Sequence, residues 1–76
     1  MTLEIDKAYY IYTADRNVFK GTFKQMVRTE GSEGRVELYH FGNCELYVGG
    51  EPREPIMDDM WFVNPHVKYF TSALIP

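Results

Sequence analysis

The side chains best suited to acid–base or nucleophilic chemistry are few and scattered. They are His40, Cys44, His66 and the adjacent carboxylates Asp58 and Asp59. Cys44 follows His40 by four residues, but no third orienting group and no oxyanion-hole loop accompany this pair. We therefore interpret Cys44 as a small packing residue and His40 as an inward-facing histidine at the edge of a core. The sequence predicts a protein that is not an enzyme and has no catalytic residues.

Metal and cofactor sites are also not indicated. The five residues above lack the compact spacing of a metal site, and the single cysteine excludes a cysteine-based zinc cluster and an intrachain disulfide. The stretch GGEP at positions 49–52 is too short for a phosphate-cradling loop and lacks its lysine. A chain of 76 residues also leaves no room for a deep cofactor cleft. We predict no metal and no cofactor.

Nucleic acid is the alternative partner. Lys20, Lys24 and Arg28 recur at even positions of one expected strand, and Tyr10 and Tyr12 are candidate stacking platforms beside them. The net charge of −3 argues against this alternative, because phosphate binding needs a basic field. Residues 1–29 carry five basic and three acidic side chains, whereas residues 30–76 carry three basic and eight acidic ones.

Protein recognition is the function that the sequence favours. The chain is 16% aromatic, and a small domain cannot bury all of these rings. Aromatic anchors dominate the energetics of protein interfaces. The expected partner-binding residues are Tyr10, Tyr12, Tyr39, Phe41 and Tyr47. We expect an adaptor or inhibitor of bacterial or phage type that binds another protein, with a homo-oligomer as an open alternative and no membrane as partner.

Alternating side chains predict the strands that must hold these residues. Strands are expected near residues 7–13 and 18–28, where Tyr9, Ile11, Phe19 and Phe23 share the inward parity. The stretch TADRN between them is typical of a turn. Tyr10 and Tyr12 then point away from the core side, either onto a surface groove or beneath a terminal helix.

Two further strands are expected near residues 35–41 and 44–49. The stretch FGNC would join them, and a three-residue loop at 42–44 puts Val36, Leu38, Leu46 and Val48 on one face. The stretch GGEPREP, with Pro52 and Pro55, is then expected to be a loop.

The C-terminal segment allows two interpretations. Asn64 followed by Pro65 is a good helix start, and Val67, Phe70 and Leu74 follow with helical spacing, which predicts a short helix. The alternative is a closing strand over VKYFTSA, because Val, Tyr, Phe and Thr prefer strands.

The expected fold class is mainly β, a small, strongly bent antiparallel sheet of four to five strands in one domain of residues 1–76, with α+β as the alternative. The pattern resembles an SH3-like barrel, although the chain lacks the ALYDY-type stretch of peptide-binding SH3 domains and the acidic RNA-pocket motif of the Sm type. No apolar run of signal-peptide or membrane-span length occurs, and the single cysteine fits a reducing compartment. We therefore expect a soluble cytoplasmic protein.

The absence of metal-ligand spacing leads to a direct test. Elemental analysis of the purified protein is expected to find zinc and iron far below one atom per chain. Stoichiometric metal that survives dialysis against a chelator would contradict this prediction.

Overall fold

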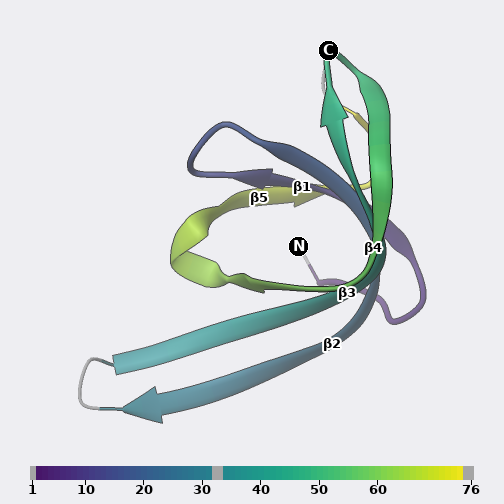
Figure 1. The fold of residues 1–76 in the computed structure, drawn as a ribbon. Helices are drawn as coiled ribbons and strands as arrows, with labels where there is room; N and C mark the ends of the chain where they lie inside the picture. The colour runs from purple at the N-terminus through teal and green to yellow at the C-terminus, as the bar shows by residue number, and fades with distance from the viewer. Residues whose placement is uncertain (1, 32–33, 75–76) are drawn as a thin grey trace.

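The computed structural model describes residues 2–31 and 34–74, and these residues form five antiparallel strands. The strands are β1 (Ala8–Thr13), β2 (Val18–Gly31), β3 (Gly34–Val48), β4 (Glu51–Val63) and β5 (Val67–Thr71), with a 3₁₀ turn, η1 (Asn64–His66), before β5. They form one sheet in the order β4-β3-β2-β1-β5, which curls into a half-barrel (Figure 1). The predicted mainly β class with a strongly bent antiparallel sheet is confirmed.

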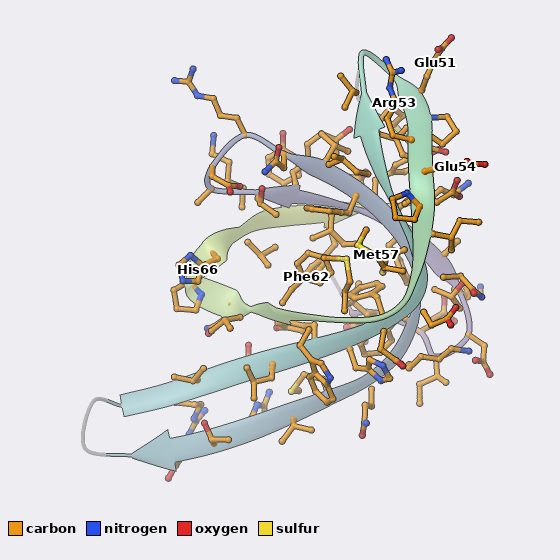
Figure 2. The ribbon with its side chains drawn as sticks, viewed as in Figure 1. Glu51, Arg53, Glu54, Met57, Phe62 and His66 are labelled. Carbon is orange, nitrogen blue, oxygen red and sulfur yellow. The ribbon has the colours of Figure 1, made fainter. Side chains whose placement is uncertain are left out.

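The core lies on the inner side of this curled sheet. A sheet that has no second layer to cover it must bury one face by curling on itself. Phe41 is fully buried there, and its ring centroid lies 5.4 Å from that of Phe23, 5.8 Å from Phe62 and 5.7 Å from Phe70. Figure 2 shows Phe62 and Met57 pointing into the same interior. The other buried apolar residues are Tyr9, Ile11 and Cys44.

The first two strands follow the alternation of the sequence. Tyr9 and Ile11 on β1 are buried, and Phe23 on β2 is buried as predicted. The turn between the strands is stabilised by Asp15, whose carboxylate accepts hydrogen bonds from the Thr13 hydroxyl and the Asn17 side-chain amide. These elements were predictable because each strand has one apolar face.

The predicted turn at 42–44 is wrong. The two strands expected near 35–41 and 44–49 are one strand, β3, and the chain turns instead at Gly49 and Gly50, so that Val48 pairs with Glu51. Both glycines have positive φ, 61° and 82°, which a two-residue hairpin turn requires and glycine adopts without strain.

An irregularity in β3 takes the place of the predicted turn. Asn43 has a φ of 51°, and the register between β2 and β3 shifts beside it. Such an extra residue reverses the side-chain parity of a strand. Phe41 and Cys44 therefore both face the core, and Val48 is 48% exposed, so the predicted inner set of Val36, Leu38, Leu46 and Val48 is wrong.

The stretch GGEPREP was expected to be a loop, but it forms the turn and the first residues of β4. Pro52 and Pro55 are tolerated there because β4 lies at the edge of the sheet, where one side of the strand needs no hydrogen bonds. Figure 2 shows Glu51 and Glu54 pointing away from the rest of the molecule at this strand.

The predicted C-terminal helix is also wrong. Only the 3₁₀ turn η1 forms at Asn64–His66, and the Asn64 side chain accepts a hydrogen bond from the backbone N–H of Glu37 instead of capping a helix. The closing strand, the alternative interpretation, is the structure found, because β5 pairs with the free edge of β1 and packs Phe70 against Phe41.

The close packing of β2 on β3 predicts a large difference between two glycines. A Cβ at Gly21 would lie 2.6 Å from Cys44 Sγ and 3.1 Å from Phe41 Cβ, whereas a Cβ at Gly31 meets nothing within 4 Å. We expect Gly21→Ala to lower the free energy of unfolding by about 1–3 kcal/mol through overpacking, and Gly31→Ala to leave it nearly unchanged. Urea unfolding measures both, and equal midpoints for the two variants would refute the packing at Gly21.

Candidate functional site

Four tyrosines gather on the outer surface of the half-barrel. Tyr10 and Tyr12 lie on the outward parity of β1, opposite the buried Tyr9 and Ile11. Tyr12 pairs across the sheet with Tyr69 of β5 and with Val18 of β2, and Val18 pairs in turn with Tyr47 of β3. We call this surface, formed by Tyr10, Tyr12, Tyr47 and Tyr69, the tyrosine face.

The rings of the tyrosine face hold each other in place. Tyr10 and Tyr47 meet edge to face with centroids 5.4 Å apart, and Tyr12 and Tyr69 lie 4.7 Å apart. Partial burial and a hydrogen bond with the Tyr10 hydroxyl raise the pKa of Tyr47. The Nζ atom of Lys20 lies 5.3 Å from the Tyr10 ring centroid, a cation–π distance. The result is an ordered aromatic surface with a cation at one side.

Two of the predicted partner-binding residues do not belong to this surface. Phe41 is fully buried at the centre of the core, so its expected surface position is wrong. Tyr39 lies on the same inner side, with its ring 5.0 Å from Phe70 and its hydroxyl donating to Glu37. The irregularity at Asn43 explains both positions, because it reverses the parity that the sequence predicts.

Sequence reasoning did not include Tyr69 in the partner-binding set. The residue was part of a predicted helix, and only the pairing of β5 with β1 brings its ring, 44% exposed, beside Tyr12. The preference of VKYFT for a strand was the signal in the sequence that could have indicated it.

The three predicted basic residues are separated in the structure. Lys20 lies beside Tyr10, but β2 has a register shift between Phe23 and Gln25 that interrupts the row. Lys24 pairs with Asp6 at 3.1 Å, and Arg28 pairs with Glu37 at 2.8 Å. Lys20, Lys24 and Arg28 therefore form no continuous basic track.

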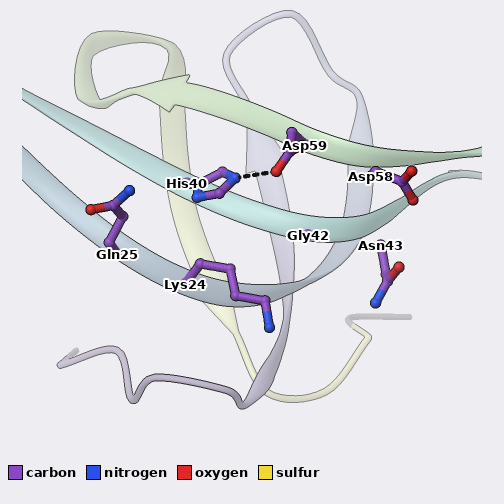
Figure 3. A pocket seen from close by; sticks show the side chains of 7 residues that line it. All are labelled: Lys24, Gln25, His40, Gly42, Asn43, Asp58 and Asp59. Carbon is purple, nitrogen blue, oxygen red and sulfur yellow. Dashed lines mark hydrogen bonds and ion pairs between the residues drawn. The ribbon is translucent and has the colours of Figure 1, made fainter.

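A polar pocket of about 520 Å³ lies where the strands are irregular. Figure 3 shows its lining, which comes from β2, β3 and β4 and consists of Lys24, Gln25, His40, Gly42, Asn43, Asp58 and Asp59. His40 Nε2 lies 2.6 Å from Asp59 Oδ1, and the imidazole stacks on the exposed Trp61 with centroids 4.7 Å apart. His40 thus faces outward, and the predicted inward position is wrong. The sequence could not indicate its partners, because Asp59 and Trp61 are neighbours only through the register of β3 with β4.

The pair of Cys44 and His40 has no geometry for nucleophilic catalysis. Cys44 is fully buried on the inner face of β3, while His40 faces outward beside Trp61. The other histidine, His66, lies in η1, where Figure 2 shows it at the far end of the turn between β4 and β5. In residues 2–31 and 34–74, no three His, Cys, Asp or Glu side chains are arranged to hold a metal ion.

Comparisons with protein-family models, with curated proteins and with solved structures find no match. No helix within the described ranges is long and apolar enough to cross a membrane.

The position of Cys44 predicts how its thiol reacts. Burial raises the pKa of Cys44 to about 11, so the reactive thiolate is scarce in the folded protein at pH 8. We expect Ellman's reagent to modify Cys44 at least a hundredfold more slowly in the native protein than in urea. Equal rates in the two conditions would show that the thiol is not enclosed in the core.

Proposed function

We propose that this protein is a small non-enzymatic protein-binding domain, of adaptor or inhibitor type, and that the tyrosine face is its binding surface. The observation that carries the proposal is the joining of four tyrosines from β1, β3 and β5 on the outer side of the sheet. None of the four belongs to the buried core. Their grouping is therefore not required to fill the interior.

The arrangement of the rings supports this proposal energetically. Tyrosine offers a large contact area with few rotatable bonds, and an interface loses less entropy when its anchors are already ordered. The contacts of Tyr10 with Tyr47 and of Tyr12 with Tyr69 restrict these rings before a partner arrives.

Single-stranded nucleic acid is the second candidate, and Lys20 beside the Tyr10 ring is the observation that favours it. It is the weaker candidate, since Lys24 and Arg28 are each paired with a carboxylate and the whole chain carries a net charge of −3.

We further propose an SH3-like architecture and a cytoplasmic setting. The four-stranded meander, the 3₁₀ turn and the pairing of β5 with β1 support the first. The second rests on Cys44, a buried and unpaired cysteine that suits a reducing compartment.

Truncation of the central tyrosines tests the proposed function. The double variant Tyr10→Ala/Tyr12→Ala removes two aromatic pair contacts, each worth about 0.5–1.5 kcal/mol, whereas truncating a single core ring such as Phe41 costs about 3–5 kcal/mol. The variant is therefore expected to be destabilised but to remain folded. Binding should weaken on the order of thirtyfold, which corresponds to about 2 kcal/mol. Thermal melts and quantitative capture of partners from native lysate, with and without nuclease, measure both effects.

Trp61→Ala is the matched control, because it removes an exposed aromatic side chain outside the tyrosine face. The proposal would be contradicted if Trp61→Ala abolished capture of the partner while the double tyrosine variant still captured it. Two results would favour the nucleic-acid candidate. The first is that capture of the partner disappears on nuclease treatment, and the second is that changing Lys20, Lys24 and Arg28 to glutamine lowers both the affinity and its dependence on salt.

A further inference from the structure

We infer that the protein forms a symmetric dimer in which the β2 strands of two copies pair antiparallel, with Thr29 of one copy opposite Thr29 of the other. The inference goes beyond the proposed function, because it concerns a surface other than the tyrosine face. Three features carry it: an unpaired strand edge on β2, the direction of the backbone groups along that edge and the order of its charges.

The surface is residues 25–31 of β2, which we call the open edge. β1 pairs with β2 only from Val18 to Thr22, and the N-terminal segment adds backbone hydrogen bonds at Phe23. Within the part of the chain that the structure describes, residues 25–31 pair with β3 on one side and with no strand on the other. Figure 1 shows these ends of β2 and β3 extending away from the other strands.

The open edge has few of the features that protect sheet edges. A hairpin of two strands is only marginally stable in water, and a third strand or another packed element is needed to stabilise it. All residues from 24 to 31 are exposed. The open edge has no proline and keeps a regular register with β3, whereas the β4 edge carries Pro52 and Pro55. A further strand can therefore add to β2 at this position.

The backbone groups of the open edge point outward at even-numbered residues. The N–H of Glu37 donates to the Asn64 side chain, which lies on the β4 side of β3, so this N–H points away from β2. Arg28 is the partner of Glu37 in β2, and the two residues of such a pair direct their backbone groups to opposite outer sides. The N–H and C=O of Arg28 thus face the open edge. Alternation along the strand gives Met26 and Glu30 the same direction.

The order of charges makes the open edge complementary to itself. Arg28 and Glu30 lie two residues apart, so their side chains share one face of the hairpin. Within the chain, Arg28 pairs with Glu37 at 2.8 Å and Glu30 pairs with Arg35 at 3.2 Å. Pairing two copies about Thr29 puts Arg28 of each copy opposite Glu30 of the other. Each row across the resulting sheet then alternates in charge, with Glu37 and Arg28 of one copy followed by Glu30 and Arg35 of the other.

Other registers lack this complementarity. Pairing centred on Arg28 or on Glu30 sets like charges directly opposite each other, which is destabilising. Pairing centred on Val27 puts Arg28 opposite Met26 and forms no ion pair between the copies. Exposed ion pairs add little affinity, so the charges select the register while the backbone hydrogen bonds between Arg28 and Glu30 hold the copies together. The charges therefore favour a second copy of this chain over an unrelated extended peptide.

Sedimentation equilibrium of the full chain, from micromolar to millimolar concentration, tests the inference. We expect the average mass to rise toward twice that of the chain. Arg28→Glu and Glu30→Arg should each weaken association at least tenfold, because each sets like charges opposite across the dimer. An equimolar mixture of these two variants should recover association, because both interchain pairs are then of opposite charge. Lys68→Glu, a charge reversal at an exposed position of β5, is the matched control and should associate like the wild type.

Cysteine variants test the register. The two Thr29 residues form a non-hydrogen-bonded pair, whose Cβ atoms lie about 4.5–5.5 Å apart, close to the span of a disulfide. The two Val27 residues are offset by about 13 Å along the strands. We expect mild oxidation to cross-link Thr29→Cys at least tenfold faster than Val27→Cys. The wild type should not cross-link, because Cys44 is buried.

Several outcomes would overturn the inference. A wild-type chain that stays monomeric at millimolar concentration excludes the dimer. Failure of the two charge variants to associate when mixed, or faster cross-linking through Val27→Cys than through Thr29→Cys, excludes this register. A dimer that Tyr10→Ala/Tyr12→Ala disrupts and the charge variants leave intact would place the contact on the tyrosine face instead of the open edge.

Discussion

The burial of one face of a single sheet is the constraint on which this structure depends. Within the described residues no helix or second sheet covers the inner face, so the five strands curl until that face encloses its own side chains. Phe41 occupies the centre, in ring contact with Phe23, Phe62 and Phe70 from three other strands. Gly21 belongs to the same constraint, because a Cβ there would collide with Cys44 where β2 approaches β3.

Curling also explains where the sheet is irregular. Long strands bend around a core by inserting bulges, and the register of β2 with β3 shifts twice, on either side of the pair Thr22 and Gly42. The polar pocket lies at this level of the sheet. The interaction of His40 with Asp59 and Trp61 is thus a product of the same bending that buries Phe41 on the opposite side of β3.

The tyrosine face is the outer counterpart of the core. Each inward residue of β1 has an outward neighbour, and in this chain the outward neighbours on β1 are Tyr10 and Tyr12. The β4 edge of the sheet is less suited to recognition, because β4 carries prolines and acidic side chains that disfavour pairing with another strand. The side-chain surface is therefore a better candidate for recognition than the backbone of this edge.

The sequence by itself determined the mainly β class, the first two strands and the outward parity of Tyr10 and Tyr12, because these depend on alternation within a short segment. Only the tertiary structure decided the turn at Gly49 and Gly50, the burial of Phe41 and the strand at Val67–Thr71.

The physical reason is that a bulge changes the side-chain parity of a strand without a clear local signal in the sequence. Asn43 is a residue type that suits a hairpin turn as well as a bulge. The strand preference of β5 likewise overcomes its helical spacing only because β1 offers a free edge and Phe41 offers a surface for Phe70. Contacts between residues distant in the sequence also place Tyr69 beside Tyr12 on the tyrosine face. Such contacts likewise pair Lys24 with Asp6 and Arg28 with Glu37, so that these two cations are not part of a basic row.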